Sequence, residues 1–403
     1  MAPQIYSEKR FGVNSNQLSK NALGIIDKLQ KKGFDAYIVG GGIRDLIKGL
    51  QPKDFDIATN CQPEEIRKLF KNSRIIGRRF QLVHITFPNE IVETTTFRSG
   101  KNSNDDSMQI NDGGRILRDN VWGTQEEDVF RRDFTINSIY YDPFSKEIID
   151  YTAGIKDLKS KVIKFIGDPE QRIKEDPVRI LGAIRFAAKL NFKIEKRALP
   201  AIKKYRAQIT DMPPARVYEE IAKLFLLGHS ENSYCLLKEL GVLQILFPHT
   251  NLNKERYDTF FTNAFRDTDE RFKQNKKLNP GFLFATLLWP KVFEESEIDT
   301  KINFRKFYQT TANVIRRQQL ITAIPRRFTS FIKDVWMYQI RFNKIGKKSI
   351  SFSQSLRFRA AYDFLLIRKQ LEPDLEERIN WWTEFKTANY DKKIRLLKLK
   401  RKR

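Results

Sequence analysis

The stretch from residue 36 to residue 59 restricts the fold of this chain more than any other part of the sequence. The apolar run "AYIV" predicts a short buried strand, three consecutive glycines follow it, "IRDLIKGL" predicts a helix, and "DFDIAT" predicts a second strand. Glycine has no Cβ, so a triglycine turn lets another group come close to the backbone. This order of elements predicts a mixed α and β unit built around one small sheet.

Two carboxylates on the second predicted strand indicate a function for that turn. Asp54 and Asp56 are two residues apart, and side chains on a strand alternate, so both are expected on one face. Neighbouring carboxylates repel each other unless a cation lies between them, and Mg²⁺ is commonly held by one or two carboxylates plus substrate phosphates. The turn and the helix N-terminus after it suit a triphosphate, and Arg44 adds positive charge. The combination predicts a nucleotide and metal site, although either part alone is also typical of a solvated turn.

A further carboxylate, Glu93, lies on the second strand of a predicted hairpin. "FQLVHITF" and "EIVETTTF" both alternate with a period of two around "PNE". Glu93 shares its face of that strand with Ile91, Thr95 and Phe97. Two interpretations fit this pattern: Glu93 is a third acid of the active site, or it is an exposed strand residue.

The charge of the chain indicates its type of partner. The 403 residues suffice for two or three domains, and 74 Lys and Arg against 49 Asp and Glu give a formal net charge of +25. Such a charge favours binding to polyanions such as nucleic acid. Two separated cysteines and three scattered histidines argue against a disulfide framework and against a zinc or histidine metal site. No secretory signal pattern and no bilayer-spanning apolar run are visible, so we expect a cytoplasmic protein without a membrane partner.

The character of the sequence changes near residue 155. Before that point, helices are predicted at 20–33 and 63–70, strands at 134–143 and 147–152, and a mobile loop at 99–128, which is rich in Ser, Asn, Asp and Gly. From about residue 170 onward, long helical periodicities dominate and strand signals are few. The fold class is therefore α+β, with a mixed-sheet N-terminal domain followed by an all-α C-terminal region.

Five motifs, in this order, resemble those of class II nucleotidyltransferases, the group that holds the tRNA CCA-adding enzymes and the bacterial poly(A) polymerases. They are "GGGIRD", "DFD", "EEDVFRRDFTINS", "DYTAGIKDL" and "EDPVRILGAIRFAAKL". Within the group, "IIGRRFQLVHITF", "PRRFTSFIKDVWMYQIRF", "FRAAYDFLLIR" and "WWTEF" resemble segments of bacterial poly(A) polymerases, so the likeness covers roughly residues 35 to 390. It implies a palm-like catalytic head at 1–155, a helical neck with base-reading and RNA-binding elements at 156–250, a helical body and leg that binds RNA at 251–390, and a basic tail at 391–403.

The resemblance also implies a role for individual residues. Asp54 and Asp56 match the metal-binding aspartates, and Asp133 matches an active-site aspartate linked to ribose recognition, which competes with Glu93 as the third acid. The nucleotide-binding residues that it implies are Gly41, Gly42, Arg44, Arg132, Asn137, Asp176, Arg179 and Arg185.

The pair Asp176 and Arg179 matches the residues that read the incoming base, and this role has a physical reason. Adenine and cytosine both present a donor next to an acceptor on their Watson–Crick edge, whereas uracil and guanine present the opposite order. An acceptor beside a fixed guanidinium fork therefore suits A or C. The same segment is also a plain helix start, with Asp176 as N-cap and Pro177 at the first helical position.

Two positions depart from the family pattern. Gly182 stands where the family usually has an arginine, so Arg179 or Arg185 has to cover that nucleotide contact, or nucleotide binding is weaker. Ala153 replaces a common glycine of "DYTAG", which predicts a stiffer hinge after the catalytic domain.

The resemblance implies a template-independent transfer of AMP from ATP to an RNA 3′-hydroxyl group, with release of pyrophosphate. The expected cofactors are two Mg²⁺ ions, with Mn²⁺ as an alternative, and the expected partners are ATP and RNA 3′ ends. We expect a monomer, with RNA-decay proteins or an RNA chaperone as further partners. Trp336, Tyr338, Trp381 and Trp382 are either base-stacking residues or, as their helical spacing favours, core residues.

Three other functions compete with this one. A tRNA CCA-adding nucleotidyltransferase uses the same chemistry with CTP as well as ATP. A non-catalytic RNA-binding protein is disfavoured because Asp54, Asp56 and Asp133 are intact. A basic protein of the membrane surface lacks a lipid-anchor motif and a clean amphipathic basic helix.

Overall fold

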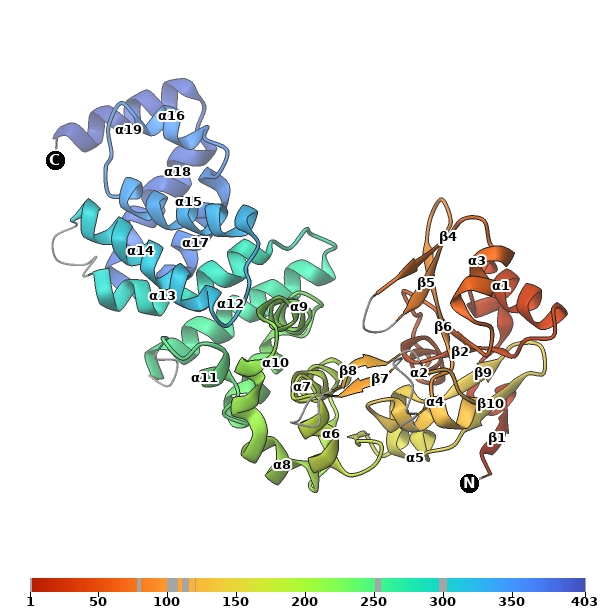
Figure 1. Ribbon diagram of the computed structural model, residues 1–403. Helices are drawn as coiled ribbons and strands as arrows, with labels where there is room; N and C mark the ends of the chain where they lie inside the picture. Colours follow the sequence, from red (N-terminus) through yellow and green to blue (C-terminus); the bar gives the residue numbers. More distant parts are fainter. Residues whose placement is uncertain are drawn as a thin grey trace. The chain divides into compact units, whose positions relative to one another are not determined.

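The computed structural model describes residues 2–77, 81–99, 108–110, 116–119, 121–250, 255–296 and 303–402. The chain divides into two compact units, Met1–Tyr205 and Arg206–Arg403. The first unit holds the sheet and the second is helical (Figure 1). The predicted fold class, a mixed-sheet N-terminal domain followed by an all-α region, is confirmed.

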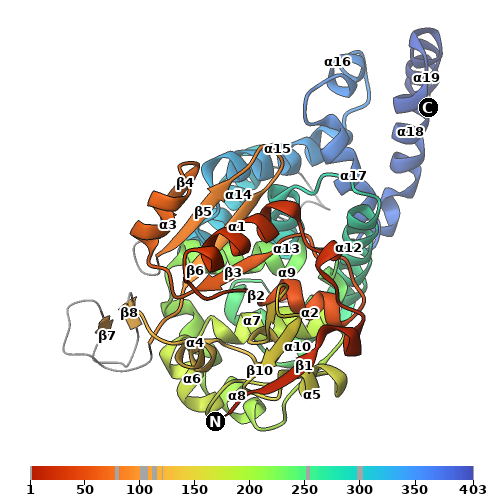
Figure 2. The same cartoon turned by 90° about the vertical axis from the view of Figure 1, so that its right-hand side faces the viewer.

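The first unit is built on an eight-stranded sheet with the order β1-β10-β9-β2-β3-β6-β5-β4. Neighbouring strands are antiparallel except for β3 and β6, which run parallel in the described part of the sheet. Figure 2 shows β1 next to β10 at one edge. The strands are β1 (Gln4–Ser7), β2 (Ala36–Val39), β3 (Asp56–Thr59), β4 (Ser73–Ile76), β5 (Leu82–Thr86), β6 (Ile91–Thr96), β9 (Tyr140–Asp142) and β10 (Glu147–Asp150).

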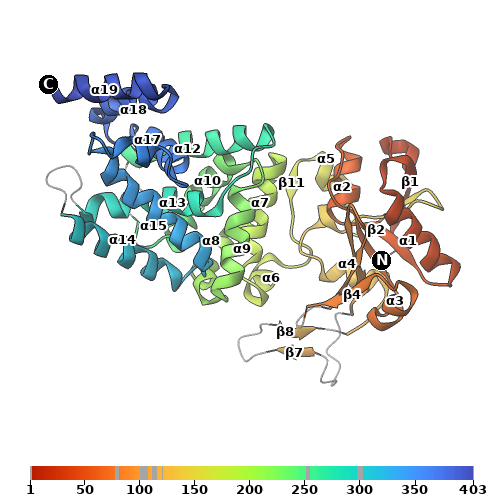
Figure 3. The same cartoon turned by 90° about the horizontal axis from the view of Figure 1, so that it is seen from above.

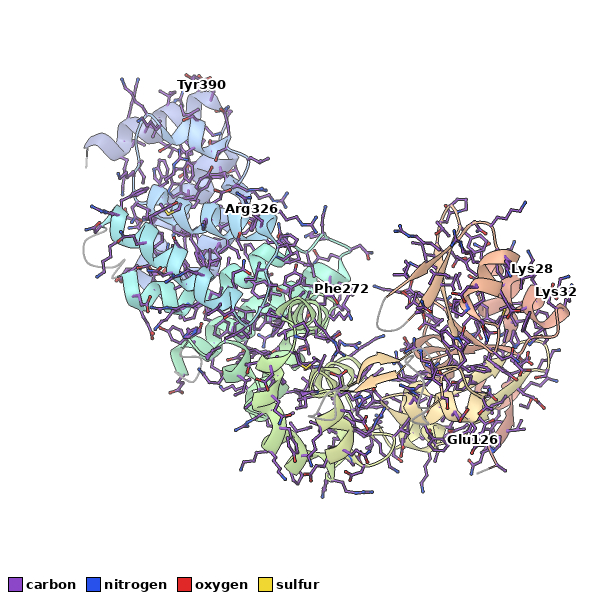
Figure 4. The ribbon with its side chains drawn as sticks, in the orientation of Figure 1. Lys28, Lys32, Glu126, Phe272, Arg326 and Tyr390 are labelled. Carbon is purple, nitrogen blue, oxygen red and sulfur yellow. The ribbon has the colours of Figure 1, made fainter. Side chains whose placement is uncertain are left out.

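One face of this sheet is covered by helices α1 (Lys20–Lys31), α2 (Gly41–Ile47) and α3 (Pro63–Leu69). Helix α1 begins at the N-cap Ser19, whose Oγ accepts a hydrogen bond from the Ala22 amide at 2.9 Å. Its apolar face packs on the strands in the main core of the unit. Lys28, labelled in Figure 4, donates to the Leu69 carbonyl at 2.6 Å and so joins α1 to α3.

The opposite face of the sheet carries a smaller core and helix α4 (Gln125–Arg131). Val39, Ala58, Phe97 and Tyr140 project from this face and pack with Val129 of α4. Because strand side chains alternate, Asp56 lies on the same face as Ala58. The second face is therefore where the predicted site lies.

The remaining elements of the first unit follow or flank the sheet. They are η1 (Glu8–Phe11), η2 (Ser15–Gln17), the hairpin β7 (Met108–Ile110) and β8 (Ile116–Asp119), η3 (Thr135–Asn137), α5 (Gly154–Lys159), β11 (Val162–Ile163), α6 (Pro169–Glu175), α7 (Arg179–Leu190), β12 (Lys193–Ile194) and α8 (Ala198–Tyr205).

The second unit packs its helices around aromatic side chains. Trp289, Trp336 and Trp382 are fully buried, so Trp336 and Trp382 are core residues and do not stack on bases. Figure 3 shows α13, α14 and α15 side by side. The elements are η4 (Arg206–Asp211), α9 (Pro214–Phe225), α10 (Ser230–Glu239), α11 (Leu243–Leu246), α12 (Glu255–Lys273), α13 (Pro280–Ser296), α14 (Phe304–Gln319), α15 (Arg326–Phe342), α16 (Ser349–Ser353), α17 (Phe358–Arg368), η5 (Pro373–Leu375), α18 (Glu376–Thr387) and α19 (Tyr390–Lys402).

The basic C-terminal segment is a helix in the structure. Leu396 and Leu397 of α19 pack against the aromatic core that contains Trp382 and Phe385. The four-part division at residues 155, 250 and 390 remains a prediction.

Three local predictions are wrong. The second strand begins at Asp56, so Asp54 lies in the segment before it. The segment 99–128 contains β7, β8 and the start of α4, while the rest of the predicted loop at 100–107, 111–115 and 120 lies outside the described residues. Residues 134–143 form the 3₁₀ turn η3 before β9.

None of the described helices combines the length and the apolar character that crossing a membrane requires.

Candidate active site

The glycine turn brings the end of β2 and the start of β3 together. Gly40 has φ +76°, a left-handed conformation that favours glycine, and an added Cβ there would lie 3.5 Å from Oδ2 of Asp56. A Cβ at Gly42 would lie 3.1 Å from the Phe55 ring and 3.3 Å from the Asp54 carbonyl. Gly41 meets no comparable restriction, because its Cβ would lie 3.6 Å from Arg44. The backbone of the turn thus packs directly on the segment that carries both aspartates.

Asp56 is the most perturbed carboxyl group of this site. Burial raises its pKa from 3.8 to about 6, repulsion from Glu93 and Asp54 adds to the rise, and Arg132 opposes it. Asp54 is exposed, whereas Asp56 is partly buried. The site therefore combines a partly buried carboxyl group with two further carboxylates, Glu93 and Asp54, that lie near enough to raise its pKa.

The parallel pairing of β3 and β6 explains why Glu93 is close to Asp56. Ile57 is in register with Thr94, so the preceding residues of both strands are neighbours on the same face. Glu93 also faces His84 across the β5–β6 ladder, with 3.3 Å between His84 Nε2 and Glu93 Oε1. Its side chain is 49% exposed, so Glu93 is at once an exposed strand residue and a neighbour of Asp56.

These carboxylates fit a hard divalent cation. Oxygen donors from one or two carboxylates, completed by substrate phosphates, are the usual protein environment of Mg²⁺. Within the ranges that the structure describes, no group of three or more His, Cys, Asp or Glu side chains is arranged to hold a metal ion by itself. Burial, with repulsion from Glu93 and Asp54, raises the pKa of Asp56, and a cation bound beside it would favour the ionised form.

Arg44 lies beneath the glycine turn and is fully buried. Its Nη1 donates to Oδ1 of Asn137 at 2.7 Å, and its Nη2 lies 2.7 Å from Oδ1 of Asp45. Lys189 of α7 approaches the other oxygen of Asp45 at 3.3 Å. The structure thus brings Arg44 and Asn137 together as predicted, and it shows Arg44 as part of the support of the turn rather than as an exposed charge.

Arg132 is held on the sheet face by two residues that sequence reasoning missed. Its Nε donates to Asp128 Oδ2 at 3.1 Å and to the Tyr140 hydroxyl at 3.1 Å, and Tyr140 donates to the same Asp128 oxygen at 2.5 Å. Burial alone would lower the pKa of Arg132, but Tyr140 and Asp128 raise it above its ordinary value. A signal for α4 was present, because "TQEE" at 124–127 is a capping box and the structure forms it.

Asp133 points to a different set of partners. Its Oδ1 accepts a hydrogen bond from Arg179 Nε at 2.6 Å and lies 3.7 Å from Arg172. Arg179 also donates to Glu175 at 2.8 Å, so two carboxylates fix its guanidinium group. The carboxylate that the structure places near Asp56 is Glu93, whereas Asp133 lies with the predicted base-reading arginine.

Asp176 is buried at the junction of α6 and α7. Its Oδ1 accepts a hydrogen bond from the Val178 amide at 3.3 Å, and α7 begins later, at Arg179. Asp176 therefore closes a turn between two helices instead of capping α7 as its N-cap. The two predicted base-reading residues lie at the two ends of this turn.

The last two predicted positions lie on α7. The Arg185 guanidinium lies over the Phe186 ring at 4.2 Å. An added Cβ at Gly182 would be 3.5 Å from Phe134, which packs on Phe165 and Phe186. At the position where the family usually has an arginine, the backbone of this chain lies against an aromatic cluster.

Comparisons with known proteins identify the family of the chain. Residues 36–164 match the family described as "Poly A polymerase head domain", residues 191–253 match "Probable RNA and SrmB- binding site of polymerase A", and residues 302–403 match "Polymerase A arginine-rich C-terminus". The chain is 38% identical over 399 residues to poly(A) polymerase I of Salmonella typhi, which covers 95% of this chain and 86% of that protein.

The chain is also similar, at lower coverage or identity, to nucleotidyltransferases that add nucleotides to tRNA. The chain is 37% identical over 287 residues to the CC-adding tRNA nucleotidyltransferase of Halalkalibacterium halodurans, covering 71% of this chain and 66% of that protein. The solved structure of the Bacillus stearothermophilus CCA-adding enzyme in complex with CTP aligns with a TM-score of 0.64 at 23% identity, over 89% of this chain and 81% of that one. This structural likeness concerns the fold.

Proposed function

The chain belongs to the poly(A) polymerase family of nucleotidyltransferases, and from this we propose that its head transfers AMP from ATP to RNA 3′-hydroxyl groups at the face of β3 and β6. As a polynucleotide adenylyltransferase, it needs a place where a triphosphate meets carboxylates. The observation that carries the proposal is the position of the Asp56 carboxylate against the side-chain-free turn at Gly40. A triphosphate lying on that turn is within reach of both aspartates.

Asp54 and Asp56 are the proposed metal-binding residues. Two Mg²⁺ ions, or Mn²⁺ in their place, would neutralise the triphosphate and lower the pKa of the attacking 3′-hydroxyl group. The Asp56 carboxylate lies at the turn, and Asp54 and Glu93 add negative charge near it. We propose Glu93 as the third acid, and Asp133 as a residue that orients the base-reading arginine.

The remaining residues orient the nucleotide. Arg44 and Asn137 support the turn from below, so the path of the backbone beside the phosphates is fixed before substrate binds. Arg132 presents a positive charge near Asp56, held by Asp128 and Tyr140. Because catalysis of this kind is positioning plus charge stabilisation, we expect no covalent enzyme intermediate.

Selection of the base is assigned to the turn between α6 and α7. Arg179 is held as a fixed donor fork by Glu175 and Asp133, and Asp176 adds an acceptor at the same turn. Adenine and cytosine match this order of donor and acceptor, whereas uracil and guanine leave both protein groups unpaired. A monomeric state, location in the cytoplasm and binding to RNA-decay proteins or an RNA chaperone stay predictions.

One assay tests both chemistry and substrate. An RNA primer is incubated with ATP alone, with CTP alone and with both, and the products are sized on a gel. Long tails from ATP alone support the proposal, while addition of C residues followed by a single A identifies a tRNA CCA-adding activity. Asp54→Ala should abolish transfer and leave RNA binding largely intact, and normal elongation by this variant would refute the assignment.

A further inference from the structure

A row of ionisable residues crosses four neighbouring strands of the first unit. Strands β3, β6, β5 and β4 are adjacent in that order (Figure 2). Glu93 of β6 is paired with His84 of β5, and His84 is paired with Arg74 of β4. The parallel pairing of β3 with β6 adds Asp56 of β3 at the same register position. The row therefore runs from the proposed metal site outward to the edge strand β4.

This row lies on the face of the sheet that carries the active site. Val83 and Ile85, the neighbours of His84 along β5, are buried in the core that includes α1, α2 and α3. Because strand side chains alternate, His84 points to the opposite face. There, His84 is partly exposed and Glu93 is half-exposed. Both side chains thus share a face with Asp56 and are open to solvent.

His84 holds one oxygen of the Glu93 carboxylate. Its Nε2 lies 3.3 Å from Oε1 of Glu93. An ionised carboxylate only accepts hydrogen bonds, so the imidazole nitrogen is the donor. On its other side Glu93 meets Asp56, whose pKa it raises by charge repulsion. The contact with His84 therefore favours one orientation of a side chain that its acidic neighbour repels.

The chemistry of this partner suits a carboxylate that acts on a cation. A Lys or Arg side chain would bring a permanent positive charge that competes with the cation, whereas an imidazole N–H can hold a carboxylate oxygen without a net charge. The second oxygen of Glu93 can then meet the cation while the first is held. Carboxylates at metal ions are commonly held by such hydrogen bonds, and loss of the partner typically lowers metal affinity or activity about 10–100-fold.

A surface pair without function is the competing interpretation. Pairs between exposed side chains contribute little to stability, and breaking such a pair would leave cation binding and catalysis unchanged. The position of this pair favours a functional role, because its acidic member lies beside Asp56 on the adjacent strand. The two interpretations thus differ in what the loss of His84 does to the metal site.

We propose that His84 is a positioning residue that orients Glu93 toward the cation at Asp56. This role rests on the proposed function, because it requires a divalent cation at that place. His84 acts through Glu93 and is not itself a ligand of the cation or the nucleotide. Glu93 keeps its charge for the cation and is already oriented when the substrate arrives.

Mn²⁺ binding to the full chain without nucleotide, followed by the EPR signal of the free ion, tests the proposal. The site to be followed is the one that Asp56→Asn abolishes. His84→Phe keeps a planar ring that suits a strand but removes the donor, and it should weaken this site about tenfold. His84→Gln retains an N–H donor and should restore most of the affinity. The matched control, Thr86→Val, changes an exposed residue on the same face of β5 and should alter the affinity less than about twofold.

A double-mutant cycle shows whether His84 acts through Glu93. In a Glu93→Gln background, His84→Phe should change the Mn²⁺ affinity less than about twofold, because the carboxylate that His84 positions is gone. In AMP transfer with Mg²⁺, His84→Phe alone should lower kcat about tenfold. It should leave KM for ATP within about twofold, since the glycine turn and Arg179 are unchanged.

The outcomes separate a failure of this inference from a failure of the proposed function. Unchanged Mn²⁺ affinity in His84→Phe, or an equal loss with and without the Glu93 carboxylate, overturns the inference alone, and so does a His84→Gln variant as weak as His84→Phe. If Asp56→Asn removes no Mn²⁺ site, or Asp54→Ala still transfers AMP, the proposed function fails and the inference fails with it. Thermal melting verifies that each variant is folded, and His84→Ala, with the same expectation, replaces His84→Phe if the latter unfolds.

Discussion

Replacement of Asp56 by asparagine should stabilise the metal-free protein while it abolishes AMP transfer. The carboxyl group titrates at about 6 in the folded chain against an ordinary 3.8, mainly because it is buried. One pKa unit corresponds to 1.36 kcal/mol, so ionisation of Asp56 costs up to about 3 kcal/mol of folding free energy. Asparagine has nearly the same shape and no charge, so it avoids this cost.

The direction of the pKa shift of Asp56 determines how the stability gain from Asp56→Asn depends on pH. The folded state binds the Asp56 proton more tightly than the unfolded state does, so stability falls as the pH rises from 3.8 to about 6. The advantage of Asp56→Asn should be about 3 kcal/mol near pH 7 and only about 1 kcal/mol near pH 4.5. Added Mg²⁺ should stabilise the unchanged protein and reduce the difference, because only the unchanged protein keeps both proposed ligands.

The buried thiol of Cys61 allows unfolding of the first unit to be measured separately. Cys61 is buried in the core of the first unit, whereas Cys235 is exposed in the second. In a Cys235→Ser background, labelling of Cys61 in increasing urea and EDTA follows the opening of the first unit by itself. The free energy of unfolding is then compared between the unchanged residue and Asp56→Asn at both pH values.

Asp54→Asn is the matched control for this measurement. It removes the same charge from the same site, but Asp54 is exposed, so its effect on stability should stay within about 0.5 kcal/mol. Equal stabilisation by both substitutions would refute the role of burial. No stabilisation by Asp56→Asn near pH 7 would refute the strained carboxylate site altogether.

Four further substitutions test the supporting structure. Ala153 has φ 61°, a conformation that costs less for glycine, so Ala153→Gly should raise the free energy of unfolding by about 1 kcal/mol. Gly154→Ala places a Cβ 2.2 Å from the Thr135 carbonyl oxygen and should lower that free energy by about 1–3 kcal/mol. Thermal melting measures both effects. Asp128→Asn weakens the hold on Arg132 and should lower kcat/KM for ATP about tenfold, with RNA affinity unchanged as the control. Gly182→Ala should be tolerated and gain up to about 1 kcal/mol in urea denaturation, because its Cβ makes only ordinary contact; a loss would show a tighter site than the structure has.

Local patterns in the sequence predicted the elements of the head but not their pairing. The strand at 36–39, the glycine turn and the hairpin with Glu93 each follow from periodicity within one short segment. The parallel pairing of β3 with β6 joins segments far apart in the chain, and no periodicity encodes it. For that reason the two interpretations of Glu93 stayed open in the sequence, and the pairing brings Glu93 beside Asp56.

The burial of Arg44 shows a second limit of sequence reasoning. An arginine next to a glycine turn suggests a charge directed at phosphates, yet the structure buries it on Asn137 and Asp45. Asp45 follows Arg44 directly, but Asn137 comes from η3, and only the tertiary fold shows that this amide is the partner. The sequence therefore identified the residues of the turn, whereas the fold assigns Arg44 a supporting role.

Arg132 and Asp133 are consecutive residues of one motif, yet they belong to two separate hydrogen-bond networks. The conformation of the backbone explains this separation. Helix α4 ends at Arg131, and its C-cap Arg132 has the extended angles φ −65° and ψ 160°. Successive side chains on an extended chain point in opposite directions, so Arg132 turns to Asp128 and Tyr140 on the sheet face while Asp133 turns to Arg179. The first network contains Arg132, whose charge acts on Asp56, and the second fixes Arg179, the arginine proposed to read the base. A substitution that extended α4 by one turn would rotate both side chains together, so phosphate chemistry and base selection should fail jointly, whereas Asp128→Asn should impair the first alone.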